Sequence, residues 1–266
     1  MTTNLNDVFS SAEGMGLGSS GNEIDAVQNY LTHYGYADLP TVGALTAGEF
    51  DNSLVEAIKQ YQNFFSLSPT GILDEQTLKE MVKPRCGFPD FPNKANSMAN
   101  YTTVSSWPST PISYRIVNFS PQMTQQEIRN AVNNAFNLWE GNCGVSFNAV
   151  TTGGDILISF GNLTHGSCPN PFDGPGGTLA HAYYPPPAGG VLAGDAHFDE
   201  DETWSVTLPI PVGQHDFETV AAHEFGHSIG LGHSRVRNAL MFPTYLGTHR
   251  HLDQDDINGA QALYGV

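Results

Sequence analysis

The segment HEFGHSIGLGH at residues 223–233 constrains the fold of this chain more than any other stretch. On a helix, His223 and His227 are four residues apart and therefore share one face. Gly230 then allows a sharp turn, because glycine adopts backbone conformations that other residues avoid, and the turn can return His233 to the same point. Three neutral imidazoles leave one position of a tetrahedral zinc ion open to water, which is typical of a catalytic site.

Glu224 directly follows the first predicted ligand, so its carboxylate can stand beside the metal without binding it. Zinc makes bound water acidic and a neighbouring carboxylate can accept the proton, which is the chemistry of hydrolysis. HExxH alone is common by chance, but the extended pattern with a third histidine is far rarer. The segment therefore predicts a hydrolytic zinc site with Glu224 as general base.

Composition narrows the possible partners. The 266 residues carry a formal net charge of −17, which argues against nucleic acid as a partner. No run is long and apolar enough to cross a bilayer, and the start of the chain lacks the basic and apolar regions of a secretory signal. Three cysteines, Cys86, Cys143 and Cys168, are too few for a disulfide framework. We expect a globular protein whose core needs no disulfide support.

The N-terminal part reads as a tail followed by helices. Residues 1–21 are rich in Ser, Gly and Asn, which predicts a flexible tail. Apolar residues recur at helical spacing over 22–34 and 54–65, and Asp74 can cap a third helix that ends near Met81. This all-α, three-helix segment resembles the peptidoglycan-binding-like module found in propeptides.

The segment PRCGFPD at 84–90 follows these helices directly and resembles the cysteine switch of matrix metalloproteinases. A thiolate is a better zinc ligand than water, so Cys86 in the fourth position would keep the enzyme latent. Two prolines and a glycine favour an extended path across a cleft. The resemblance implies that Arg85 pairs with Asp90. The alternative is a free cysteine in a loop.

Residues 91–109 have no periodicity and predict a linker, which by resemblance contains the activation cleavage region. A strand is expected over 112–116, and Thr124 with Glu127 can form a capping box that opens a helix through Trp139. Four short strands are expected near 145–150, 155–160, 179–184 and 194–199. The zinc helix should begin near residue 216, and a last helix should run over 253–264.

Three further motifs extend the resemblance. The segment ALMFP at 239–243 fits the methionine turn of metzincin peptidases, with Met241 below the metal, and 172–182 and 194–204 are close to matrix metalloproteinase signatures. The chain thus resembles a minimal matrix metalloproteinase zymogen (a matrixin, of the metzincin clan) without a hemopexin domain. The implied fold is α+β: a propeptide over 22–90 and a catalytic domain over 110–266, with a mixed, mostly parallel five-stranded sheet and three helices.

The family binds a structural zinc through a His-x-Asp pair and two further histidines, which implies His165, His181 and His197 as ligands. The aspartate does not match, because Ser167 stands where it should be. Serine is a poor zinc ligand, so three options remain: Cys168 replaces the carboxylate, water fills the position, or the site is weak. A Cys143–Cys168 disulfide competes with the first option, and two free buried thiols are the remaining possibility.

The resemblance also implies calcium, for which hard oxygen ligands in loops are suited. One implied site takes Asp173, Asp199 and Glu202 with backbone oxygens of Gly174 and Gly176, and another takes Asp155 and Asp195. Solvated surface carboxylates are the alternative. Gln122 stands where a further calcium-binding aspartate often lies, so a third site is not expected.

We therefore expect a secreted, latent zinc endopeptidase that is a monomer and cleaves internal peptide bonds of extracellular or matrix-type proteins after an activating protease removes the propeptide. By resemblance, substrate should pair with the strand around Ala182. A specificity pocket with Thr219 at its floor and Pro243 and Tyr245 in its wall should accept a Leu-like or larger side chain. The alternative is a cell-wall or glycan-binding protein with a secondary peptidase domain. No function is expected for the remaining histidines, His33, His215, His249 and His251.

Overall fold

The computed structural model describes residues 5–91 and 100–266 and shows an α+β protein, as expected. The chain divides into two compact units. The N-terminal unit comprises Met1–Lys83 and Phe88–Met98, and the C-terminal unit comprises Pro84–Gly87 and Ala99–Val266. The centre of the predicted switch, Pro84–Gly87, therefore belongs with the C-terminal unit although it lies between N-terminal segments in the sequence.

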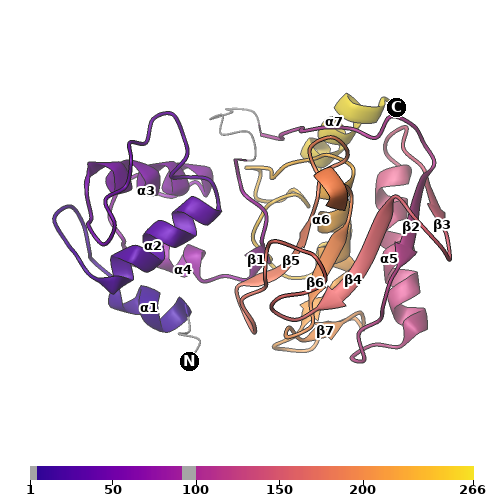
Figure 1. Cartoon of the computed structure of the whole chain (residues 1–266), viewed down its shortest axis with the longest axis horizontal. Helices are drawn as coiled ribbons and strands as arrows, with labels where there is room; N and C mark the ends of the chain where they lie inside the picture. The colour runs from indigo at the N-terminus through magenta and orange to yellow at the C-terminus, as the bar shows by residue number, and fades with distance from the viewer. Residues whose placement is uncertain (1–4, 92–99) are drawn as a thin grey trace. The chain divides into compact units, whose positions relative to one another are not determined.

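The N-terminal unit contains the three expected helices and one more (Figure 1). Helices α2 (Asn22–His33), α3 (Asn52–Phe64) and α4 (Glu75–Met81) match the prediction. Asp51 and Asp74 cap α3 and α4 by accepting hydrogen bonds from the backbone N–H groups of Leu54 and Thr77. Such caps satisfy donors that a helix start leaves unpaired.

The expected flexible tail is wrong over residues 5–21, because α1 (Leu5–Ser11) forms there. Phe9 is fully buried and lies edge-on to Tyr30, with ring centroids 5.6 Å apart. The backbone that follows is also tied down, since the Gly14 and Gly18 N–H groups donate to the carbonyl oxygens of Leu73 and Phe50. Leu5, Val8, Phe9 and Ala12 do recur at helical spacing, but the run is short and followed by small polar residues, so its periodic signal is weak.

The C-terminal unit is built on a mixed sheet in the order β1-β5-β6-β4-β2-β3. All neighbours in it are parallel except β5 and β6, so the mostly parallel arrangement is confirmed. Five strands form the expected sheet, and the switch segment adds β1 as a sixth. The strands are β1 (Arg85–Cys86), β2 (Ile112–Ile116), β3 (Phe147–Ala149), β4 (Ile156–Gly161), β5 (Thr178–Ala182) and β6 (Ala196–Asp199). A separate short pair joins β7 (Trp204–Ser205) to β8 (His215–Asp216), and η1 (Gly190–Leu192) is a single 3₁₀ turn.

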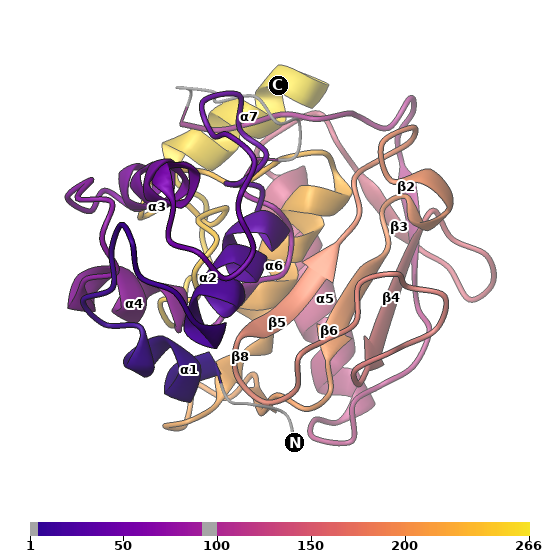
Figure 2. The same ribbon diagram turned by 60° about the vertical axis from the view of Figure 1, so that its left-hand side comes forward.

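Three helices complete this unit, as expected: α5 (Gln125–Glu140), α6 (Phe217–Ser228) and α7 (Gln254–Tyr264). The predicted capping box of Thr124 and Glu127 opens α5. In Figure 2, α5 and α6 lie behind β4, β5 and β6. Every residue of α6 is buried, so its polar residues must find partners inside the protein.

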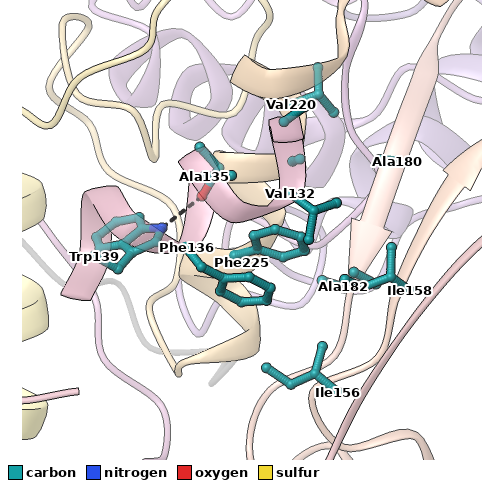
Figure 3. Close-up of a cluster of buried hydrophobic side chains, with 14 of the residues drawn as sticks. Val132, Ala135, Phe136, Trp139, Ile156, Ile158, Ala180, Ala182, Val220 and Phe225 are labelled. Atoms are coloured by element: carbon teal, nitrogen blue, oxygen red, sulfur yellow. Dashed lines mark hydrogen bonds between the residues drawn. The ribbon is translucent and has the colours of Figure 1, made fainter. Parts of the chain in front are cut away.

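Helices α5 and α6 pack through stacked aromatic rings (Figure 3). The rings of Phe136 and Phe225 lie 3.9 Å apart at an interplanar angle of 2°. The Trp139 indole N–H donates to the Ala222 carbonyl oxygen over 2.9 Å. Ile156 and Ile158 of β4 are fully buried in the same core. These contacts fix α6, and hence the histidines on it, against the sheet.

Among the helices described, none combines the length and the apolar character needed to cross a membrane.

Candidate metal centre and substrate groove

The turn after α6 brings the third histidine back to the first two. Gly230 has φ +108°, and a Cβ there would lie 1.7 Å from the Ser105 carbonyl oxygen, so no other residue fits. The Leu231 N–H donates to the Gly226 carbonyl oxygen over 2.9 Å, which closes the helix end. His233 is 1% exposed, directly after this turn.

Four buried side chains converge beneath this turn: Cys86, His223, His227 and His233. Their ligand atoms all lie within 4.8 Å of one another. Cys86 Sγ is 3.4 Å from His227 Nε2, and His227 Nε2 is 3.2 Å from His233 Nε2. A tetrahedron with metal–ligand bonds of about 2.0–2.3 Å places its donor atoms roughly 3.3–3.6 Å apart, so this donor set fits zinc.

Backbone carbonyl groups orient two of the imidazoles. His223 Nδ1 lies 2.7 Å from the Leu240 oxygen, and His227 Nδ1 lies 2.7 Å from the Leu231 oxygen. Each contact requires the proton on Nδ1 and leaves Nε2 as the free electron-pair donor. Burial, and then the neighbouring His233 and His223, hold the pKa of His227 well below its usual value. The ring is therefore neutral, as a metal ligand must be.

Glu224 is fully buried beside the cluster. The Cys86 thiol donates to Glu224 Oε2 over 3.7 Å, while Glu224 Oε1 is buried without a hydrogen-bond partner. Burial raises the pKa of Glu224 to about 8, and the Cys86 contact opposes this shift. A carboxyl group with a raised pKa beside a metal site can both accept and return a proton near neutral pH.

The loop carrying Met241 lies directly under α6. A Cβ on Gly226 would lie 2.2 Å from Met241 Sδ, so the absence of a side chain at residue 226 lets the loop approach. Asp256 of α7 anchors the loop by accepting the Leu240 and Met241 N–H groups over 2.7 and 3.0 Å. The predicted methionine turn is thus in place below the histidines.

The segment 84–87 lies in an extended groove that ends at the metal cluster. Its strand β1 pairs in parallel with β5, and Cys86 is opposite Ala180. The Gly87 N–H donates to the Ala180 oxygen over 2.8 Å on one side, and the Cys86 N–H donates to the Pro243 oxygen over 2.9 Å on the other. A peptide held between a strand edge and a facing wall is β-strand addition. The Arg85–Asp90 pairing stays a prediction.

A cavity of about 150 Å³ opens beside His223 and Glu224. Thr219, Pro243 and Tyr245, which were predicted to form a specificity pocket, all line it, as does His249. No role for His249 was predicted from the sequence. The His249 N–H donates to Thr219 Oγ1 over 2.8 Å, a contact between residues 30 apart in the sequence. Ala182 lies on β5 opposite Ala196 and is not among the residues that line the cavity.

A second cluster lies in the loop that follows β4 and on β5 and β6: His165, Cys168, His181 and His197. Its ligand atoms are again within 4.8 Å of one another. All three cysteines are free, so the alternative of a Cys143–Cys168 disulfide is wrong. Cys143 is buried on α5's C-terminal side, where its thiol donates to the Trp139 carbonyl oxygen.

Comparison with known proteins agrees with this geometry. The family model described as "Matrixin" matches residues 106–265, more than half of the chain. The chain belongs to the matrixin family of peptidases. A second model, "Putative peptidoglycan binding domain", matches residues 20–81. The C-terminal unit is therefore a zinc metalloendopeptidase domain, and as a matrixin the chain uses zinc and calcium.

Curated relatives of this matrixin include interstitial collagenase of Equus caballus, 43% identical over 246 residues, which are 91% of this chain and 50% of the relative. Neutrophil collagenase of Homo sapiens is 43% identical over 219 residues, 81% of this chain and 44% of the relative. Stromelysin-1 of Mus musculus is 39% identical over 248 residues, 91% of this chain and 49% of the relative. The chain thus spans about half the length of these relatives.

Carboxylates gather in this matrixin where one calcium site was expected. Asp199 is fully buried, and its Oδ2 has no hydrogen-bond partner. Burial, with the negative charges of Asp201, Glu202 and Asp173, raises the pKa of Asp199 to about 7. Glu202 accepts the Gly176 N–H over 2.5 Å, which places that glycine at the site. A cation would relieve this repulsion.

The residues expected at the other calcium site already have hydrogen-bond partners. Asp155 accepts the Ser113 N–H over 2.9 Å, and Asp195 accepts the Leu157 N–H over 2.9 Å. Gln122, which replaces a family aspartate, donates to the Glu202 carbonyl oxygen over 2.8 Å and accepts the Trp204 N–H over 3.0 Å. Its amide thus braces a loop that a cation would otherwise brace. Both calcium assignments stay predictions.

Part of the expected linker is hydrogen-bonded to the end of α6. Residues 92–99, which are part of the predicted cleavage region 91–109, lie outside the described residues. Beyond them, the Val104 N–H donates to the Gly230 oxygen over 2.9 Å, and the Trp107 indole N–H donates to the Ser228 oxygen over 2.8 Å. This part of the chain supports the turn that carries His233.

Proposed function

We propose that this chain is the latent form of a zinc-dependent endopeptidase that cleaves internal peptide bonds in extended segments of extracellular or matrix-type proteins. The observation that carries the proposal is the convergence of Cys86 with His223, His227 and His233 beside the buried Glu224. Bound zinc would supply a Lewis acid for water and for the scissile carbonyl group. The three imidazoles would hold it, and Cys86 would occupy the position that water needs.

Once Cys86 leaves, Glu224 would take a proton from the attacking water and then deliver it to the leaving amine. The unpartnered Oε1 of Glu224 supports this role, because it is buried and aimed at no protein group. Substrate would take the place of residues 84–87 on the edge of β5, near Ala180 and Ala182, where backbone hydrogen bonds are available. The substrate side chain that follows the cleaved bond would enter the cavity lined by Thr219, Pro243 and Tyr245.

Latency would end when an activating protease cuts the predicted linker over residues 91–109, which follows Cys86. We propose that the protein acts outside the cell, where substrates of this class lie, and that it acts as a monomer. The glycan-binding alternative is not favoured, since among the described aromatic side chains of the N-terminal unit Phe88 is half-buried and the others are buried: Phe9, Tyr30, Tyr34, Tyr36, Phe50, Tyr61, Phe64, Phe65 and Phe91.

The test compares the untreated chain with three variants in zinc content and casein cleavage. Cys86→Ser should be active without treatment, and Cys143→Ser should stay latent as the matched thiol control. Glu224→Gln in the Cys86→Ser background should keep its zinc and lose activity by about 100-fold or more, because positioned acid–base groups contribute at least that much. Latency that survives Cys86→Ser, or activity that survives Glu224→Gln, would overturn the proposal.

A further inference from the structure

We infer that Cys168 supplies the fourth ligand of the second zinc site, which makes it a closed site of three imidazoles and one thiolate. This inference rests on the zinc use proposed above, but it concerns a different cluster. It assigns the ligand role to Cys168 and not to Ser167, its neighbour in the sequence. Ser167 is exposed, whereas Cys168 is only 8% exposed and faces the histidines.

Distances among the donor atoms support a single ion. Cys168 Sγ lies 3.2 Å from His181 Nε2, and His181 Nε2 lies 3.2 Å from His197 Nδ1. His165 Nε2 lies 3.1 Å from His197 Nδ1. These separations are close to the roughly 3.3–3.6 Å edges of a zinc tetrahedron with N and S ligands. Four protein donors leave no position for water, so this site is structural rather than catalytic.

The local chain explains how residues 165 and 168 reach the same ion. The Cys168 N–H donates to the His165 carbonyl oxygen over 3.1 Å, which closes a tight turn around Gly166 at φ +53°. His165 Nδ1 lies 2.9 Å from the Leu163 carbonyl oxygen, so that nitrogen carries the proton and Nε2 faces the cluster. The turn thus presents one nitrogen and one sulfur donor to His181 and His197 on the sheet.

A hydrogen bond also prepares the sulfur for a metal. The Asn170 amide donates to the Tyr183 hydroxyl oxygen over 3.0 Å, and that hydroxyl lies 3.1 Å from Cys168 Sγ. The Tyr183 hydroxyl oxygen accepts from Asn170, and its O–H can donate to the sulfur. A donor aimed at sulfur favours the thiolate, the form that binds zinc.

The test uses the full-length Cys86→Ser chain, in which the switch thiol cannot ligate metal, loaded with Co²⁺ and, separately, with Zn²⁺. We expect two metal ions per chain and a near-ultraviolet band from thiolate-to-cobalt charge transfer. Adding Cys168→Ser should remove the band and lower the affinity for the second ion. The loss in affinity should exceed the roughly 10–100-fold that is typical when a group that only orients a ligand is removed. Adding Cys168→Asp should restore the second ion without the band, because carboxylates also bind zinc.

Cys143→Ser in the same background is the control and should keep both the band and two ions. The inference fails if the Cys86→Ser chain binds two ions without the band, or if the band survives Cys168→Ser. Casein cleavage distinguishes failure of the Cys168 assignment from failure of the proposed function. An inactive Cys86→Ser chain that shows the band would overturn the proposed function alone, and an active chain without the band would overturn only the Cys168 assignment.

Discussion

Gly226→Ala tests whether the close approach of the methionine turn to α6 is required. Residue 226 is inside a helix, where the intrinsic helix propensity of alanine exceeds that of glycine by about 1 kcal/mol. Judged by local structure alone, the substitution should therefore stabilise the protein. The tertiary structure predicts the opposite. The added Cβ would lie 2.2 Å from Met241 Sδ and 2.9 Å from Trp139 Cζ2.

Both neighbours are packed in the core, with Met241 only 2% exposed. Trp139 is fully buried and its indole N–H is held by the Ala222 carbonyl oxygen, while the Met241 backbone is held by Asp256. Overpacking of a filled core costs about 1–3 kcal/mol, and here the contact is far inside van der Waals distance. The contact places the cost in the upper part of this range, about 2–3 kcal/mol, so after the gain of about 1 kcal/mol in helix propensity we expect a net loss of about 1–2 kcal/mol.

All three tryptophans, at 107, 139 and 204, lie in the C-terminal unit, so urea unfolding followed by tryptophan fluorescence reports on that unit alone. Adding Met241→Ala removes the clashing atoms, so the double variant should lose about 1 kcal/mol less than the sum of the two single losses. Equal or greater stability of Gly226→Ala, or strictly additive losses, would refute the reasoning.

Three further predictions concern single side chains. Burial raises the pKa of Asp256 to about 6 from 3.8, so the folded state holds this proton more tightly than the unfolded chain does. This tighter binding contributes about 3 kcal/mol to the free energy of unfolding below pH ~4, and the contribution should be lost as the pH rises to about 6. Urea unfolding across pH 4–7 should show a loss that is about 3 kcal/mol smaller in Asp256→Asn than in the parent chain, because Asp199, whose pKa is also raised, contributes to the loss in both. His249→Ala should enlarge the cavity and raise the ratio of kcat/KM for Phe over Leu after the cleaved bond by about tenfold, and an unchanged ratio would contradict the assignment. Gln122→Ala leaves the Trp204 N–H without its acceptor and should cost about 1–3 kcal/mol in the same fluorescence assay, whereas a loss under 0.5 kcal/mol, about the scatter of surface substitutions, would show that the brace is not needed.

Local spacing predicted the catalytic cluster well. His223 and His227 share a helix face, and Gly230 provides a turn that only glycine allows, so three ligands follow from one short segment. The capping box before α5 was predicted for the same reason, since its two hydrogen bonds join residues three apart. Helix α1 was missed because its apolar run, Leu5 to Ala12, covers only about two turns, and its stability depends on burying Phe9 against Tyr30.

Ligand type and helical period are local properties, so the order of residues along the chain was enough to predict which of them can bind a metal. Three features required the folded structure: Cys168 rather than Cys143 joins the histidines, residues 84–87 complete the edge of β5, and His249 lines the cavity. Each of these depends on contacts between segments far apart in the chain. Such contacts are fixed by packing and backbone pairing, which local spacing does not encode.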